Sequence, residues 1–291
     1  MSLSRTPSGL AAQYLFYKDK VLVYVEGHTD IPFYKIVLKN YNCRIRTYSE
    51  ETDYHKLLEV LAADDPHYVV ILDGHYEILT RRRSKHRRLV LLHRHSCENY
   101  LFEEEPIEQF RYSRAFLRDT SEKLPSSFSE ILEDTELKFK ELLILDVAHQ
   151  RAKTGCRVVP KGAEQFFVGS TADFEEDRIQ ERCSEATLGI DKKSIEEAKT
   201  LVREFLKNHR FIDLLPGHFA FSIIRRWINH TVNVRHRILE EDIRVYLSTE
   251  VWRLVNTRDH NSLKRRLRRA VREAEKIRQA SKSQTQSNTG L

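Results

Sequence analysis

The chain of 291 residues is long enough to bury a sizeable core, and its composition excludes several protein classes. Hydrophobic residues make up 40% of it, and glycine and proline are scarce, which predicts a globular, helix-rich α/β protein rather than a disordered one. Its cysteines, Cys43, Cys97, Cys156 and Cys183, form no CxxC pair, which argues against a disulfide scaffold or a zinc knuckle and for a reducing compartment. No window approaches the roughly 18 apolar residues of a membrane span, so we expect a cytoplasmic protein.

The net charge of +6 is unevenly distributed along the chain. Residues 81–88 carry six positive charges, and residues 262–278 carry eight positive and two negative charges. Clustered arginines and lysines displace condensed counterions from phosphates, so this asymmetry favours a polyanionic partner over a uniformly solvated surface. For residues 81–88 we expect contact with phosphates. For residues 262–278, phosphate contact and a solvated helix face both stay open.

The first predicted element is a strand at Val21–Val25, whose five apolar or aromatic residues do not alternate with polar ones. Such a run is typical of a parallel sheet that is covered on both faces. Glu26 and Gly27 follow at once, and a helix then begins near Pro32. Ligands of open α/β sheets bind beyond the carboxyl ends of the strands, where Glu26 is expected, although a structural ion pair explains this carboxylate equally well. Asp30 alone fits a helix cap better than a ligand.

The same pattern recurs in the elements that follow, which are predicted as strands at 43–48, 67–72 and 89–92 and a helix at 54–63. The second of these strands also ends in a carboxylate and a glycine, Asp73 and Gly74. Right-handed crossovers place the carboxyl ends of parallel strands side by side, so the two acids are expected at one edge of the sheet. Ser96 is a candidate cap for a further helix, with Glu98 in its first turn near the same edge.

Past Pro125 the alternation of strands and helices fades, and helices are predicted at 130–153, 192–208, 216–227, 240–255 and from Ser262 onward. The stretch between the first two of these helices can return one or two short strands to the sheet. The last helix repeats apolar residues at a four-three spacing, which is a seam for a partner helix or for the protein's own body: Leu263, Leu267, Ala270, Ala274 and Ile277. We therefore expect a core at 1–125, a mostly helical region at 126–280 and a disordered tail at 281–291.

The acids form an oxygen-rich set: Glu26 and Asp73, joined by Glu98, Asp30 or Glu77. Hard divalent cations such as Mg2+ take carboxylate ligands and keep positions open for phosphate oxygens. A metal there polarises a phosphodiester while one acid handles protons. The chain has no GxGxxG, GxxxxGK[ST] or GxSxG motif, so dinucleotide binding, P-loop phosphoryl transfer and nucleophile-elbow hydrolysis lack their signatures. His93 and His95 fit solvated or hydrogen-bonded histidines better than a metal pair.

These motifs resemble the Toprim fold shared by topoisomerases, bacterial primases and overcoming-lysogenization-defect nucleases. That family has a glutamate and a glycine after its first strand, which V-E-G-H-T-D at Val25–Asp30 matches, and an Asp-x-Asp after a later strand, which Asp73-Gly74-His75 matches in part. Three further motifs are similar to the branch of uncharacterised function that includes AriB-type effectors of the PARIS anti-phage system: E-G-x-x-D-I-x-F-Y at Glu26–Tyr34, E-N-Y-L at Glu98–Leu101 and P-G-H at Pro216–His218. The resemblance covers the first third of the chain and the P-G-H island.

The resemblance implies a Toprim-like, mostly parallel sheet flanked by helices, with a helical insertion and a helical C-terminal region. It implies a metal-dependent endonuclease that cleaves tRNA. Such a nuclease is a toxin that serves antiviral defense by abortive infection. An AriA-like ABC-class ATPase holds such an effector inactive until a phage trigger releases it, and the active form is a homodimer.

Residue by residue, Glu26 matches the catalytic glutamate and Asp73 the principal metal ligand. His75 stands where the family has its second aspartate, which favours Mn2+ over Mg2+, unless Glu77, Glu98 or a second subunit completes the site. The residues expected to grip the RNA are Arg81, Arg82, Arg83, Lys85, Arg87 and Arg88.

Two other functions stay open at this point. A degenerate Toprim site, suggested by His75, fits a non-catalytic module that binds nucleic acid or an ATPase partner. A DNA nickase differs only in its substrate, because DNA and RNA present the same phosphates to the same cations.

Overall fold

The computed structural model of the protein describes residues 20–48, 68–80, 86–115, 124, 126–232 and 237–288, the last range with side chains up to residue 280. The predicted helix at 54–63 and the residues Arg81, Arg82, Arg83 and Lys85 lie outside the described residues. The chain divides into two compact units. The first unit comprises residues 1–73, 83–93 and 256–291, and the second unit comprises residues 74–82 and 94–255.

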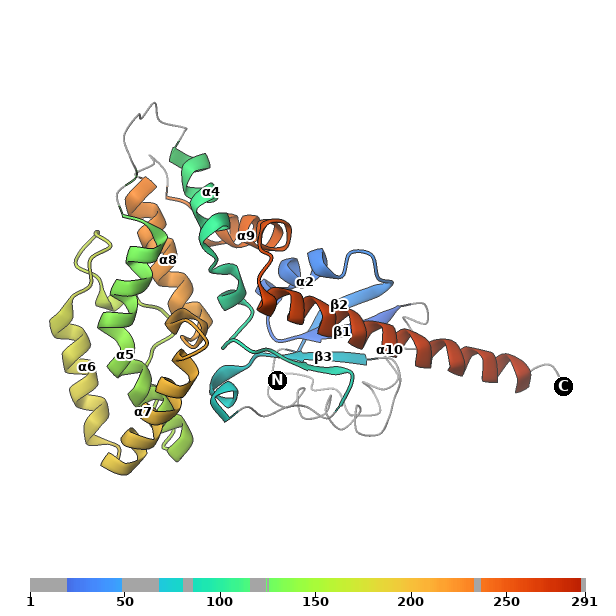
Figure 1. The fold of residues 1–291 in the computed structure, drawn as a ribbon, viewed down its shortest axis with the longest axis horizontal. Helices are drawn as coiled ribbons and strands as arrows, with labels where there is room; N and C mark the ends of the chain where they lie inside the picture. The colour runs from blue at the N-terminus through green and yellow to red at the C-terminus, as the bar shows by residue number, and fades with distance from the viewer. Residues whose placement is uncertain are drawn as a thin grey trace, which may run out of the picture. The chain divides into compact units, whose positions relative to one another are not determined.

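The first unit is built on a parallel sheet of four strands in the order β2-β1-β3-β4 (Figure 1). The strands are β1 (Val21–Val25), β2 (Cys43–Thr47), β3 (Tyr68–Leu72) and β4 (Leu89–Leu91). Every residue of β1 and of β3 is buried, which is the pattern of central strands covered on both faces. The predicted α/β class and the four strands are therefore confirmed.

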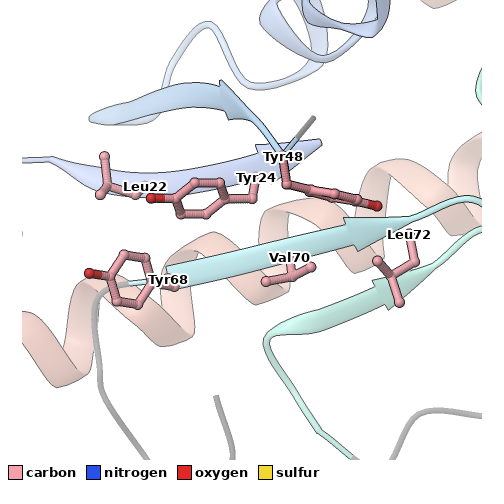
Figure 2. Close-up of a cluster of buried hydrophobic side chains, with 6 residues drawn as sticks. All are labelled: Leu22, Tyr24, Tyr48, Tyr68, Val70 and Leu72. Carbon is pink, nitrogen blue, oxygen red and sulfur yellow. The ribbon is translucent and has the colours of Figure 1, made fainter. Parts of the chain in front are cut away.

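One face of this sheet carries a cluster of apolar and aromatic side chains: Leu22, Tyr24, Tyr48, Tyr68, Val70 and Leu72 (Figure 2). Residues two apart in a strand share a face, so β1 and β3 supply most of this cluster from alternate positions. The rings of Tyr24 and Tyr68 lie 5.7 Å apart between centroids. The hydroxyl of Tyr48 donates a hydrogen bond to the carbonyl oxygen of Ile71 at 3.2 Å, which satisfies its polar end inside the cluster.

A tight turn and a short helix follow β1, as the sequence predicts. The turn is the single 3-10 helix η2 (His28–Asp30), and α2 (Ile31–Val37) begins directly after it with Pro32 in its first turn. Proline is tolerated there because the first N–H groups of a helix have no partner within the helix. This turn fixes where the chain goes after Glu26.

Helix α10 (Arg258–Asn288) returns to the first unit from the far end of the chain. Its residues Leu263, Leu267, Ala270 and Ala274 are fully buried, and the helix packs against β1, β3 and β4. The sequence left open whether the four-three seam packs against a partner helix or against the protein itself. The structure shows that it packs against the protein's own sheet. The helix also continues to Asn288, where the sequence predicts a disordered tail from 281, because extending an existing helix costs far less than nucleating one.

The second unit is mostly helical, and its long helices are α4 (Glu104–Ala115), α5 (Phe128–Ala152), α6 (Glu176–Leu188), α7 (Lys192–Leu206), α8 (Gly217–Val232) and α9 (Glu240–Leu254). Both α6 and α7 pack on α5 (Figure 1). A capping box starts α5: Ser127 Oγ accepts from the Glu130 amide at 3.2 Å, and the Glu130 carboxylate accepts from the Ser127 amide at 2.6 Å. The predicted helices α5, α7, α8 and α9 are confirmed, whereas α4 and α6 were not predicted.

In the described part of the chain, the stretch between α5 and α7 returns no strand to the sheet, a point that the sequence left open. That stretch contains α6 and one isolated antiparallel bridge between Phe167 and Phe174. The predicted division at residue 125 also differs from the observed units, because α10 finds its apolar partner on the sheet and residues 94–115 find theirs among the helices. Among the described helices, none is both long and apolar enough to cross a membrane.

Candidate functional site

Two neighbouring strands of the first unit each end in a carboxylate. β1 and β3 pair in parallel, with Leu22 opposite Tyr68 and Tyr24 opposite Val70. Glu26 follows β1 and is exposed, and Asp73 follows β3 and is half-buried. The structure thus brings both predicted acids to adjacent strand ends at one edge of the sheet, which is the edge where open α/β sheets bind their ligands.

Asp30 shapes the turn that follows Glu26. One of its carboxylate oxygens accepts a hydrogen bond from the Gly27 amide at 2.8 Å, and the other accepts from the Thr29 hydroxyl at 3.4 Å. The residue is only 5% exposed. Asp30 occupies the N-cap position of α2, as the sequence favours for Asp30 taken alone, but its side chain makes no capping hydrogen bond to that helix and holds the preceding turn instead. Its role as a metal ligand stays a prediction.

His75 and Glu77 lie in the second unit, in the 3-10 helix η3 (His75–Thr80). The φ angle of His75 is +40°, a left-handed conformation that costs a non-glycine residue about 1 kcal/mol or more. Its amide donates to the carbonyl oxygen of His95 at 2.8 Å, which helps to hold this conformation. Glu77 is exposed at the start of the same 3-10 helix. Metal binding by either residue stays a prediction.

Glu98 is a buried carboxylate with a buried counterion. It lies in the 3-10 helix η4 (Glu98–Leu101), is 3% exposed, and accepts a hydrogen bond from Arg244 Nη1 at 3.1 Å. Burial raises the pKa of Glu98, but Arg244, the Ser96 side chain and His218 outweigh burial and hold this pKa below its ordinary value. Glu98 is therefore ionised at neutral pH, and an arginine already compensates its charge. Its predicted role as a metal ligand has to compete with that ion pair.

Asn99, the second residue of the E-N-Y-L motif, ties η4 to the segment that precedes α8. Its amide nitrogen donates to the carbonyl oxygens of Ile212 at 2.6 Å and Leu215 at 2.9 Å. Its side-chain oxygen accepts from both the amide and the hydroxyl of Ser96, each at 2.8 Å. Ser96 thus bonds to Asn99 instead of capping the turn as predicted, and every donor and acceptor of this fully buried amide is used.

The P-G-H island meets E-N-Y-L through a close approach of main chain to side chain. A Cβ atom on Gly217 would lie 2.0 Å from Ser96 Oγ and 2.7 Å from Glu98 Oε2, so only glycine fits. His218 is exposed, and its Nδ1 lies 3.8 Å from Glu98 Oε1. The two motifs, which are far apart in the sequence, therefore form one network inside the second unit.

His95 is a buried imidazole beside this network. Its ring meets the rings of His75 and Tyr76 edge-on, at 5.2 Å and 5.1 Å between centroids. Its Nδ1 atom has no hydrogen-bond partner within the described residues. Burial, followed by the charges of His75, Arg157 and His218, lowers the pKa of His95 well below its ordinary value, so the ring is neutral at neutral pH. The sequence predicted a solvated or hydrogen-bonded histidine, and neither description fits this Nδ1.

Sequence reasoning missed Arg244, the partner of Glu98. Arg244 is 4% exposed, and its guanidinium lies 4.4 Å from the centroid of the Phe221 ring. It occupies the buried face of α9 together with Ile243, Leu247 and Val251. A charge inside the apolar stripe of a helix requires a buried partner, and this is the signal that could have identified it.

The predicted role of Arg88 in gripping RNA is wrong. Arg88 is 1% exposed, and its guanidinium donates to the carbonyl oxygen of Tyr68 at 3.4 Å, so it cannot reach a phosphate outside the protein. The residue directly precedes β4, which places its side chain against the sheet rather than in solvent. Arg87 is exposed and lies 3.4 Å from Glu273 in a surface ion pair, so its predicted contact with nucleic acid stays a prediction.

Neither a protein-family model nor a curated protein sequence matches this chain.

Proposed function

We propose that this chain is a metal-dependent phosphodiesterase of the Toprim type, with Glu26 as its catalytic acid or base and Asp73 as its principal metal ligand. One observation carries the proposal: β1 and β3 are adjacent and parallel, and each is followed by a carboxylate at the same edge of the sheet. Two acids at neighbouring strand ends are hard to explain by packing, because neither strand needs a charge there to bury its apolar residues.

The donor set suits a hard divalent cation. Mg2+ is commonly held by one or two carboxylates while it keeps water and phosphate oxygens as its other ligands, and Glu26 and Asp73 offer that number of carboxylates. A bound Mg2+ or Mn2+ would supply stabilisation of negative charge on the phosphodiester oxygens. An exposed carboxylate such as Glu26 can reach the solvent and a bound substrate, so it can take or give the proton that hydrolysis requires.

The remaining residues of the turn have a positioning role in this proposal. Asp30 holds the Gly27 amide and the Thr29 hydroxyl, so it fixes the direction in which the chain leaves Glu26. A side chain that reacts from a loop has to be held by such contacts, because a displacement of about 1 Å costs roughly 100-fold in rate. Asp30 would therefore act through Glu26.

We further propose the finer assignment that the family resemblance implies. The chain would be a toxic effector of anti-phage defence that cleaves tRNA, is held inactive by an AriA-like ABC-class ATPase and acts as a dimer once a phage trigger releases it. The joining of E-N-Y-L and P-G-H in one network supports this assignment, because motifs that form one structural unit are expected to occur together.

The test is cleavage by the purified chain. Total tRNA and supercoiled plasmid DNA are incubated separately with the protein in Mg2+, in Mn2+ and in EDTA. We expect metal-dependent cleavage of tRNA, and loss of about 100-fold or more of this activity in Glu26→Ala and in Asp73→Ala. Glu197→Ala, which removes an exposed acid of α7, is the matched control and should cleave like the parent.

The same assay separates the possible outcomes. Full cleavage by a folded Glu26→Ala protein would overturn the assignment of the catalytic residue. Nicking of the plasmid without cleavage of tRNA would identify a DNA nickase. Asp30→Asn distinguishes the two roles of Asp30: it should lose less than about tenfold as a positioning residue, and about 100-fold or more as an essential ligand.

A second function, a non-catalytic module that binds nucleic acid or an ATPase, is favoured by two observations. His75 replaces the second aspartate of the family motif, and Glu98 is already paired with Arg244. Binding of tRNA by the parent protein without cleavage in either metal would support this reading over the first.

A further inference from the structure

The exposed face of α10 is uniformly basic. Between residues 258 and 278, every exposed position of this helix is an arginine or a lysine: Arg258, Arg265, Arg269, Arg272 and Lys276. The last four of these follow one another at spacings of four, three and four residues, so they lie on one face of the helix. We call these four residues the α10 stripe. With a rise of about 1.5 Å per residue, the stripe extends for about 16 Å along the helix.

The stripe lies opposite the buried seam of the same helix. Each of its members comes two residues after a member of the seam, so that Arg265 follows Leu263 and Arg269 follows Leu267. Two residues are about 200° apart around a helix, which places the cations on the side away from the sheet. The packing that buries the seam therefore forces the stripe outward, and the sequence alone could not decide this.

The carboxylates of α10 do not compensate the stripe. Asp259 lies 3.9 Å from His93, and Glu273 lies 3.4 Å from Arg87. Burial, followed by the charge of Glu275, raises the pKa of the Cys43 thiol, so the three half-buried acids all act at the flanks of the helix. Within the described residues, no ion pair joins a member of the stripe to an acid. The guanidinium of Arg272 instead lies 5.8 Å from the centroid of the Tyr41 ring.

Helix α7 shows what a solvated charged face of this protein looks like. Two of its cations pair with acids three residues away: Lys199 with Glu196 at 2.8 Å, and Lys207, the C-cap residue, with Glu204 at 2.6 Å. Such i,i+3 pairs are the usual way to balance charge on an exposed helix. Within the described residues the α10 stripe has no such pair, and like charges spaced one helical turn apart repel one another. An arrangement of this kind is favourable when a polyanion neutralises it.

We propose that the α10 stripe binds the phosphate backbone of a nucleic acid. This inference rests on the proposed function, since it identifies a substrate-binding surface for the same protein. Arginines and lysines that replace the condensed counterions of a nucleic acid gain affinity without reading sequence. Four cations in one row match a run of phosphates better than they match a single small anion, because their charges are spread along the helix rather than converging on a point.

The experiment measures binding separately from cleavage. The full-length Glu26→Ala protein serves as parent, and fluorescence anisotropy gives its Kd for labelled total tRNA, and for a DNA duplex of similar length, between 50 and 200 mM KCl. The test variant adds Arg265→Gln, Arg269→Gln, Arg272→Gln and Lys276→Gln. The control variant carries an equal loss of charge on α7 and its C-cap: Lys192→Gln, Lys193→Gln, Arg203→Gln and Lys207→Gln.

We expect the test variant to bind at least about tenfold more weakly than the parent at 100 mM KCl, and to lose about 3 from the slope of log K against log salt, as four phosphate contacts require. The control should keep the slope of the parent. Equal affinity and slope in the test variant and the parent would overturn the inference, and an acidic protein surface would then be the better partner. The tRNA and duplex arms show which nucleic acid is preferred.

The outcome for the stripe is distinguishable from the outcome for the proposed function. If the wild-type chain cleaves nothing and the test variant still loses binding, the stripe stands and the nuclease proposal fails. If the chain cleaves tRNA and the test variant binds tRNA as the parent does, the nuclease proposal stands and the proposal for the stripe fails. All four substituted residues are exposed, so the thermal unfolding curve should not change; Arg269→Gln with Arg272→Gln, which removes two contacts, should lose about half as much slope.

Discussion

The carboxylates of the two units differ in what surrounds them. Glu26, at the end of β1, is exposed, whereas Glu98, in η4, is 3% exposed and hydrogen-bonded to an arginine. Both were predicted to serve one metal site. An exposed acid at a strand end keeps most of its hydration and can react, whereas a buried acid persists only with a counterion and hydrogen bonds. If the chain is the proposed nuclease, this difference favours Glu26 over Glu98 as its reactive acid, while the buried pair with Arg244 gives Glu98 a structural role in the second unit.

Replacing Arg244 gives the largest effect that this comparison predicts. Arg244→Leu leaves Glu98 buried without its counterion, which should lower the free energy of unfolding by about 3–5 kcal/mol. Arg253→Ala, on the exposed side of the same helix α9, breaks the surface ion pair with Glu250 and should cost less than about 1 kcal/mol. Urea unfolding followed by circular dichroism measures both values.

A variant that also carries Glu98→Gln sharpens this first test. Neutralising the orphaned carboxylate should recover part of the stability that Arg244→Leu loses, because the buried charge is then gone. Equal stabilities of the Arg244→Leu and Arg253→Ala proteins would contradict a structural role for the buried pair. Glu98 would then be open to reassignment as a ligand.

The close approach at Gly217 predicts the next largest effect. Gly217→Ala places a methyl group within 2.0 Å of Ser96 Oγ, so the E-N-Y-L and P-G-H motifs must move apart, at a cost of about 1–3 kcal/mol. Gly189→Ala is the control, because a Cβ there would meet a ring carbon of His149 at 3.2 Å and requires only a small shift.

Removing the obstructing hydroxyl tests the contact itself. Ser96→Ala combined with Gly217→Ala should be more stable than the sum of the two single effects predicts, and a double-mutant cycle measures this coupling. Additive changes in the free energy of unfolding would mean that Ser96 and Gly217 are not in contact. The close approach between the two motifs would then be contradicted.

The strands could be predicted because a continuous apolar run such as Val21–Val25 can be satisfied only in a covered sheet. Helix α7 was equally clear, since Ala198, Val202 and Phe205 lie on one face. The partners of these elements could not be predicted. The residues 258–288 alone do not indicate that their apolar seam packs on the sheet, because the complementary surface of the sheet is formed by other segments of the chain. Pairing across long sequence separation, as of Glu98 with Arg244, is hidden for the same reason.

Arg88 shows a different limit. Arg88 belongs to a basic run in the sequence, yet adjacent residues of this run differ in their surroundings: Arg87 is exposed to solvent, whereas Arg88 is buried against the sheet. A long side chain with five donors can lie against a strand and donate to main-chain carbonyls, which charge counting does not register. Predictions from charge runs therefore hold for the run as a whole better than for each member.

The smallest predicted effect concerns pH and again compares a buried group with an exposed one. Burial depresses the pKa of His95 in the folded state, so between that pKa and about 6.5 the unfolded chain binds one more proton than the folded chain. The free energy of unfolding therefore rises with pH in this window: the contribution of His95 is complete above about pH 6.5 and is lost as the pH falls below it, at up to about 1.4 kcal/mol per unit.

His95→Gln removes the titrating group and should flatten this dependence between pH 5 and 6.5. His230→Gln, which changes an exposed histidine of the same unit, is the matched control. The depressed pKa values of Glu98 and Asp213 act only below about pH 4.5, where these carboxylates begin to protonate, so they do not contribute to the slope between pH 5 and 6.5. An unchanged slope in His95→Gln would mean that the folded protein protonates this ring freely. The neutral core of histidine and tyrosine rings in the second unit would then be the wrong description.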